Sequence, residues 1–273
     1  MASFSDEEVR EAIMSIIDQE KVVTERELKV RLERKYFPWI VGRVLDAIVN
    51  KQLKRVGYRG RRKIGGGAPR HFFTLKGTCY KDIEPIIKKK RELTAQVNCI
   101  TSGGGIAGAH AENLFLEAFE KLGFKIHGRD MSEFGGKQVE GVSGKAPPNL
   151  DLVVERNGVV YGVDVKNWIK YESSEVEKIK KKVDVACKLD IVPFIIARYV
   201  DKDTIYEVIY KNRGLTYPYR ELLIPSSFRS LADECKSCLG YPILAVDELP
   251  DYKVRWLEKL HVDYVTKWSK IKK

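Results

Sequence analysis

The sequence feature that most constrains the fold is an Asn-Gly pair between two apolar runs. Asn157 and Gly158 separate two stretches that are rich in valine and have the composition of β-strands. An Asn-Gly dipeptide in this setting is the strongest short-range signal for a two-residue β-hairpin. Such a turn makes Arg156 the partner of Val159, and this pair sets the register of both strands.

The predicted register places two acidic residues opposite each other. Asp151 faces Asp164, and Lys166 lies two residues beyond Asp164 on the same face of the hairpin. Like charges that face each other across a sheet are destabilising, so side-chain packing gives no reason for this pair. Mg²⁺ prefers carboxylate oxygens, and a nearby lysine can hold an attacking water or stabilise charge on a phosphate. The alternative is that both aspartates are solvated residues at a sheet edge.

An apolar stripe with helical spacing precedes the hairpin and ends at Gly123. It consists of Leu114, Phe115, Ala118, Phe119 and Leu122. At about 100° per residue, Glu112 falls roughly 90° from the centre of this stripe, whereas Glu117 and Glu120 face water. We therefore expect Glu112 to look along the sheet toward the two aspartates.

These segments together resemble the PD-(D/E)xK nuclease superfamily over about residues 108–200. The matching residues are Glu112, Asn149-Leu150-Asp151 and Asp164-Val165-Lys166-Asn167-Trp168. The sequence is most similar to Mrr-like restriction endonucleases and archaeal Holliday-junction resolvases. It departs from their pattern because Pro148 stands three residues before Asp151, Asp164 replaces glutamate, and no downstream glutamine matches. The resemblance implies a restriction-endonuclease-like α/β core with a mixed central sheet and helices on both sides.

The resemblance also implies a Mg²⁺-dependent DNA endonuclease, with Mn²⁺ as a substitute. Asp151, Asp164 and the backbone carbonyl of Val165 would hold the metal, helped by Glu112 directly or through water. Lys166 would orient the attacking water, and the products would carry a 5′-phosphate and a 3′-hydroxyl. One alternative is a non-catalytic DNA-binding regulator that carries an inactive nuclease-like fold. A more remote alternative is an RNA-cleaving enzyme. The four expected positions of the site are all filled, by Glu112, Asp151, Asp164 and Lys166. This completeness favours an active nuclease over an inactive fold.

Positive charge is concentrated in the first third of the chain. The net charge is +11, and residues 1–100 hold 22 lysines and arginines against 13 acidic residues. Between Asp46 and Asp82 there is no acidic residue. A concentrated basic block is typical of proteins that bind polyanions such as nucleic acids.

The same third predicts three short helices followed by a hairpin. The signals are capping boxes at Ser5-Asp6-Glu7-Glu8 and Thr24-Glu25-Arg26-Glu27, a helix opened by Pro38, and strands at Leu53–Tyr58 and Arg70–Leu75. This order resembles the winged helix-turn-helix family, in which the third helix enters the major groove and the hairpin touches the DNA backbone. The expected DNA-binding residues are Arg43, Lys54, Arg59, Arg61, Arg62, Lys63 and Arg70. A protein-docking module is the alternative.

We predict three segments: a winged-helix DNA-binding domain at 1–80, a helical and glycine-rich linker at 81–107, and a nuclease domain at 108–273.

Cys235 and Cys238 form a lone CxxC without the second ligand pair of a structural zinc site, which favours cysteines without a metal or redox role. The sequence has no long apolar run and no secretory signal, so we expect a cytoplasmic protein without a membrane partner. The expected partner is duplex or branched DNA, and a homodimer stays open.

Overall fold

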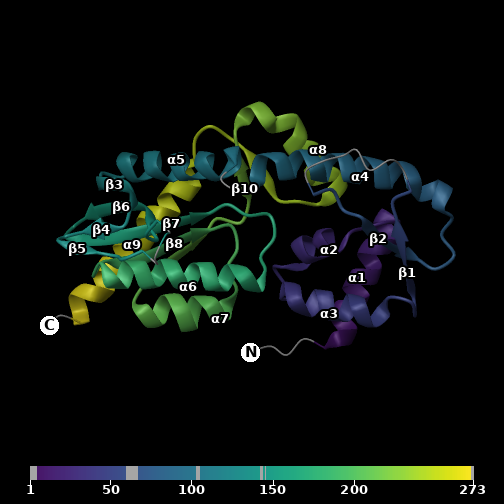
Figure 1. Ribbon diagram of the computed structural model, residues 1–273, viewed down its shortest axis with the longest axis horizontal. Helices are drawn as coiled ribbons and strands as arrows, with labels where there is room; N and C mark the ends of the chain where they lie inside the picture. Colours follow the sequence, from purple (N-terminus) through teal and green to yellow (C-terminus); the bar gives the residue numbers. More distant parts are fainter. Residues whose placement is uncertain (1–4, 60–66, 103–104, 142–143, 145, 272–273) are drawn as a thin grey trace. The chain divides into compact units, whose positions relative to one another are not determined.

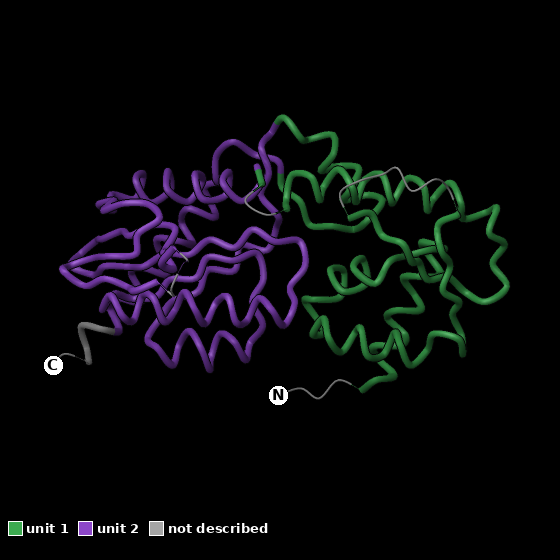
Figure 2. The backbone as a smooth tube through the Cα atoms, viewed as in Figure 1, with its two compact units in different colours: residues 1–105, 227–244 green, residues 106–226, 245–273 purple. Residues whose placement is uncertain are grey.

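The protein is mixed α/β and divides into two compact units (Figure 2). The computed structural model describes residues 5–59, 67–102, 105–141, 144 and 146–271. Unit 1 comprises residues 1–105 and 227–244, and unit 2 comprises residues 106–226 and 245–273. Among the described residues, no helix combines the length and the apolar composition needed to cross a membrane.

Unit 1 begins with the predicted order of three helices and an antiparallel hairpin. Its elements are α1 (Asp6–Glu20), α2 (Glu25–Leu32), α3 (Pro38–Ile48), β1 (Leu53–Gly57), β2 (His71–Leu75) and α4 (Tyr80–Thr101), as Figure 1 shows. Ser5 and Glu8 form the capping box of α1, Thr24 and Glu27 form that of α2, and Pro38 opens α3. The local sequence signals therefore predicted where these helices begin.

α4 packs within unit 1, whereas the sequence predicted a linker over residues 81–107. Ile83 and Ile87 are buried in a cluster with apolar residues of the hairpin, so α4 covers one face of that hairpin. Lys90 is buried as well, and its ammonium lies 2.5 Å from a carboxylate oxygen of the buried Glu27 on α2. The apolar face of α4 and this ion pair make the helix part of the N-terminal core.

Unit 1 is completed by α8 (Arg229–Leu239), which comes late in the sequence. Lys89 of α4 lies 3.7 Å from Glu234, and Arg31 of α2 donates a hydrogen bond of 3.1 Å to the carbonyl of Leu239. The sequence placed these residues in the C-terminal domain, 108–273. The structure places residues 227–244 in unit 1 instead, because α8 makes its contacts with α4 and α2.

Unit 2 is built on a five-stranded mixed sheet with the order β3-β6-β7-β8-β9. The β3–β6 and β6–β7 pairs are antiparallel, and the β7–β8 and β8–β9 pairs are parallel. The elements in chain order are α5 (Ile106–Lys121), β3 (Lys125–Met131), β4 (Glu133–Phe134), β5 (Lys137–Gln138), β6 (Leu150–Arg156), β7 (Val159–Lys166), α6 (Ser173–Lys188), β8 (Val192–Ala197), α7 (Lys202–Thr204), η1 (Ile205–Ile209), η2 (Tyr210–Asn212), β9 (Leu215–Pro218), β10 (Leu222–Ile224), η3 (Ser226–Phe228), β11 (Ile243–Ala245) and α9 (Asp251–Ile271). The predicted mixed sheet is confirmed.

α5 and α6 cover opposite faces of the sheet (Figure 1). Phe119 of α5 makes an edge-to-face contact with Phe194 of β8, at 6.1 Å between ring centroids. The next residue, Ile195, clusters with Ile179 and Val183 of α6. Because side chains alternate along a strand, consecutive residues of β8 pack against helices on opposite faces of the sheet.

The hairpin between β6 and β7 has the predicted turn and register. Asn157 and Gly158 have φ values of 54° and 72°, the left-handed conformation that this two-residue turn requires. Pairing runs from Arg156 with Val159 to Leu152 with Val163 and stops there. The two aspartates follow directly, where β7 approaches its end.

A candidate active site at the end of strands β6 and β7

Two aspartates and two lysines meet at this end of the hairpin. The ammonium of Lys166 donates to Oδ1 of Asp164 at 2.7 Å, and the ammonium of Lys182 lies 2.9 Å from the same oxygen. Lys182 also lies 3.3 Å from Oδ1 of Asp151, whose Oδ2 accepts a hydrogen bond of 2.7 Å from the backbone N–H of Val165. The structure thus brings together the predicted side chains of Asp151, Asp164 and Lys166 with the backbone of Val165, and it adds Lys182, which comes from α6.

Burial dominates the electrostatics of Asp164. Its side chain is fully buried, and this burial raises the pKa of its carboxyl above the usual value. Lys166 and Lys182 lower that pKa, whereas Asp151 raises it, so the two lysines only partly offset the cost of burial. Oδ2 of Asp164 has no hydrogen-bond partner among the described residues. A buried carboxylate oxygen without a partner marks a position where a cation or a donor would be stabilised.

Glu112 stands at the rim of this cluster, on α5. It is half-buried; burial and the charge of Asp151 raise the pKa of its carboxyl, and Lys166 lowers it. The nearest cation is Arg129, whose Nη2 lies 3.9 Å from Oε2. Within the part of the chain that the structure describes, no three His, Cys, Asp or Glu side chains are close enough together to hold a metal ion. Glu112 therefore interacts with Asp151 through its charge rather than by contact.

Asn167 fixes the end of β7 against its neighbours. Its amide nitrogen donates to the carbonyls of Ala107 and Leu223 at 2.7 and 2.6 Å. Its amide oxygen accepts hydrogen bonds of 2.9 Å from the hydroxyl of Tyr219 and from the backbone N–H of Leu223. Because Ala107 lies in the first turn of α5, this residue ties the helix that carries Glu112 to the strand that carries Lys166.

The sequence reasoning missed Lys182, although one signal could have found it. Ile179, Val183 and Ala186 form the buried stripe of α6, and Lys182 falls on the same helical face. Lysines on helices normally occupy the solvated side, whereas this side chain is only 19% exposed. A lysine inside an apolar stripe indicates a buried anionic partner.

The predicted DNA-binding residues of α3 and β1 have protein partners. Arg43 is exposed, and its Nη2 lies 2.5 Å from a carboxylate oxygen of Asp6 at the start of α1. The ammonium of Lys54 donates to the backbone carbonyl of Thr78. Arg43 therefore lies next to an acidic helix terminus, which weakens the positive potential at that point.

Basic residues stand on both sides of the tip of the β1–β2 hairpin. The guanidinium of Arg59 lies 4.4 Å from the ring centroid of Tyr80, and Arg70 is exposed. Arg61, Arg62 and Lys63, which the sequence also predicts to bind DNA, fall outside the described residues. The described residues next to the tip thus include one exposed arginine after β1 and one before β2.

The two cysteines of the CxxC lie on α8 and are free thiols. Cys235 is buried, and burial raises the pKa of its thiol to about 12. Thiolates are the metal-binding and nucleophilic form of cysteine, so a thiol that resists deprotonation is poorly suited to either role.

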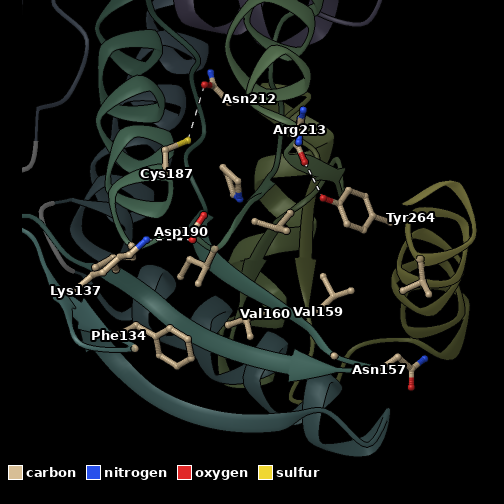
Figure 3. Close-up of a pocket in the computed structure, with 17 residues that line it drawn as sticks. Phe134, Lys137, Asn157, Val159, Val160, Cys187, Asp190, Asn212, Arg213 and Tyr264 are labelled. Atoms are coloured by element: carbon tan, nitrogen blue, oxygen red, sulfur yellow. Dashed lines mark hydrogen bonds and ion pairs between the residues drawn. The ribbon is translucent and has the colours of Figure 1, made fainter. Parts of the chain in front are cut away.

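A pocket of about 870 Å³ lies elsewhere in unit 2 (Figure 3). It opens at the start of β7 and β8, beside Val159 and Val192, and so at the other end of β7 from Asp164. Among its polar lining groups, Lys137 pairs with Asp190 at 3.0 Å. The acidic cluster and this pocket are therefore separate features.

Comparisons with known proteins leave the family of the chain open. No protein-family model matches it, and no curated protein matches it.

Proposed function

We propose that this protein is a Mg²⁺-dependent DNA endonuclease of the PD-(D/E)xK type, with a winged-helix unit that binds DNA. The observation that carries the proposal is the joint placement of Asp151, Asp164 and Lys166 at the end of one hairpin, with a buried carboxylate oxygen left without a partner among the described residues. Stability gives little reason for this cluster, because buried ion pairs often contribute less than apolar residues of the same size.

The donor set fits a hard divalent cation. Asp151, Asp164 and the backbone carbonyl of Val165 would hold the metal, and Glu112 would reach it through water. Mg²⁺ commonly uses one or two protein carboxylates and keeps several waters, so a third direct carboxylate is unnecessary. When bound, Mg²⁺ polarises a phosphate and lowers the pKa of a bound water, and Mn²⁺ supplies the same chemistry.

The side chains of the chain account for the rest of the proposed chemistry. The ammonium of Lys166 lies 2.7 Å from Asp164 and 3.9 Å from Asp151, where it can orient a water and stabilise charge on the scissile phosphate. The carboxylate of Asp151 is held by the N–H of Val165 and is therefore pre-oriented. The order of elements in unit 2, with helices on both faces of a mixed sheet, is compatible with a restriction-endonuclease-like core.

Unit 1 supports the DNA-binding part of the proposal. Three helices followed by an antiparallel hairpin is the winged-helix order, and the hairpin carries a basic, acid-free stretch of sequence. Lysines and arginines of this kind neutralise phosphates whatever the base sequence. The proposed substrate class is duplex or branched DNA, and the proposed location of the protein is the cytoplasm.

A non-catalytic DNA-binding protein is the second candidate, and one observation favours it. Lys166 and Lys182 together balance the charges of Asp151 and Asp164, as a metal-free structural cluster would.

Cleavage assays on duplex, nicked, flap and four-way-junction DNA, with and without Mg²⁺ or Mn²⁺, separate the two candidates. We expect the wild type to cut at least one substrate only when metal is present. Asp164→Asn should lose cleavage yet keep its affinity for the same DNA, because the substitution keeps the size of the side chain and removes its charge. If the wild type cuts nothing in the panel, the non-catalytic candidate replaces the nuclease. If Asp164→Asn cuts as well as the wild type, the catalytic centre lies elsewhere.

A further inference from the structure

The ammonium of Lys182 sits in a cage of three side-chain oxygens. Its Nζ lies 2.9 Å from Oδ1 of Asp164, 3.3 Å from Oδ1 of Asp151 and 3.4 Å from Oδ1 of Asn149. Two of these oxygens belong to carboxylates and the third to a neutral amide. Such a set of oxygens suits a divalent cation at least as well as an ammonium group.

The cage is held in place by its own contacts. The amide nitrogen of Asn149 donates to Asp130 at 3.3 Å, which turns the amide oxygen toward Lys182. The backbone N–H of Val165 holds the other oxygen of Asp151. Asp164 is fully buried and also presents an oxygen that has no partner among the described residues. The oxygens are therefore positioned independently of the lysine.

We propose that Lys182 occupies the cation position of the metal-free protein, and that a divalent cation binds by displacing it. The inference rests on the proposed function, since it concerns how the same site is loaded. It assigns Asn149 to the metal site beside the two aspartates, and it makes Lys182 a competitor of the metal.

Lys182 is better placed to leave the site than Lys166. Lys182 belongs to α6, a separate element, and its flexible four-carbon stem can carry the ammonium into water. Lys166 is two residues from Asp164 on the same strand, and its ammonium lies 3.5 Å from the carbonyl of Val165. When both lysines are present, they balance the two aspartates, so a dication would enter a site with no excess negative charge. Departure of Lys182 restores one negative charge to the site.

The displacement predicts that removing the competing ammonium strengthens metal binding. Lys182→Met keeps the length of the side chain and removes its charge. Lys181→Met, at the exposed neighbouring position on α6, is the matched control. In the full chain without DNA, we expect Lys182→Met to bind Mn²⁺ at least about tenfold more tightly than the wild type, measured by calorimetry or by the electron paramagnetic resonance signal of free Mn²⁺. Lys181→Met should bind as the wild type does.

Two further variants and a stability measurement complete the test. In the Lys182→Met background, Asn149→Ala should weaken Mn²⁺ binding and Asp164→Asn should abolish it. Metal-free Lys182→Met should melt at a lower temperature than the wild type, because the buried carboxylate of Asp164 and the partly buried carboxylate of Asp151 lose a cation. Mn²⁺ should raise the melting temperature of this variant more than that of the wild type.

The outcomes separate this inference from the proposed function. If the wild type binds Mn²⁺ and cuts DNA but Lys182→Met binds Mn²⁺ no more tightly, displacement is wrong and the nuclease stands. If Lys182→Met binds Mn²⁺ more tightly but no DNA is cut, displacement stands and the nuclease falls. If neither protein binds Mn²⁺ at millimolar concentration, both are overturned.

Discussion

Asn167 offers a sharp test of how the fold holds the candidate site. We expect Asn167→Ala to destabilise unit 2 and to impair any cleavage activity. The variant deletes four hydrogen bonds of 2.6–2.9 Å that link the end of β7 to Ala107, Tyr219 and Leu223. It leaves three backbone groups to find new partners in a partly buried position, whereas the hydroxyl of Tyr219 keeps its hydrogen bond of 3.0 Å to the carbonyl of Lys166.

The size of the effect follows from these contacts. A typical intramolecular hydrogen bond contributes about 1 kcal/mol net, and a stranded backbone group costs somewhat more when water cannot reach it. Four bonds with partial access to water give a loss of about 3–4 kcal/mol in the free energy of unfolding. Asn212→Ala is the control, because Asn212 is exposed and donates one local bond of 2.7 Å to Val208. That change should cost about 0.5 kcal/mol or less.

Urea denaturation followed by tryptophan fluorescence measures both variants. Cleavage should also fall about tenfold or more in Asn167→Ala under conditions where the variant stays folded, because the helix that carries Glu112 loses its anchor. If the unfolding free energies of Asn167→Ala and Asn212→Ala lie within about 1 kcal/mol of each other, the anchoring role assigned to Asn167 is wrong.

Two further predictions concern DNA affinity and pH. One variant replaces four residues of the hairpin tip together by glutamine: Arg59, Arg61, Arg62 and Lys63. The slope of log affinity for DNA against log salt concentration should become shallower by about one unit for each phosphate that this variant no longer neutralises. Fluorescence anisotropy measures the affinity. His261 is buried, and burial, followed by the charge of a nearby arginine, lowers its pKa from 6.5 to about 4. Between about pH 6.5 and 4, this histidine is protonated in the unfolded chain but stays neutral in the folded protein. The stabilisation is therefore complete above this window and is lost as the pH falls through it. The loss in the free energy of unfolding is about 2 kcal/mol after allowance for screening. Urea denaturation at pH 7 and pH 5 should show a smaller pH dependence in His261→Gln.

Each of these predictions has a control and a contrary result. For the salt dependence, glutamine at the exposed Lys202 and Lys211 of unit 2 should leave the slope unchanged. A slope that is equal in the quadruple variant and the wild type would show that the hairpin tip does not bind DNA. For the pH dependence, equal losses of stability in His261→Gln and the wild type would assign the effect to other groups.

The sequence predicted those parts of the site whose geometry is determined by neighbouring residues in the chain. The Asn157-Gly158 turn fixed which residues of β6 and β7 pair, and the observed register agrees. That register was enough to bring Asp151, Asp164 and Lys166 together, because side chains alternate strictly along strands. Hairpin turns and strand alternation are properties of neighbouring residues, so a single sequence carries them.

Contacts between distant segments were beyond this kind of reasoning. Lys182 belongs to a run of three consecutive lysines, and only the packing of α6 against the sheet decides which of them turns inward. The buried pair of Lys90 and Glu27 likewise depends on how α4 crosses α2. Neither the charge pattern nor the helical period specifies which helix will lie against which.

The placement of α8 has a consequence for how the protein is made. The chain passes between the two units three times, at residues 105–106, 226–227 and 244–245. During synthesis, unit 1 therefore cannot be completed until residue 244 has left the ribosome, by which time the five strands of the unit 2 sheet have already emerged. The surface of α4 that receives α8 stays uncovered throughout that interval. A fragment that ends at residue 105 would keep it uncovered permanently, and a single cut in the chain would not release one unit from the other.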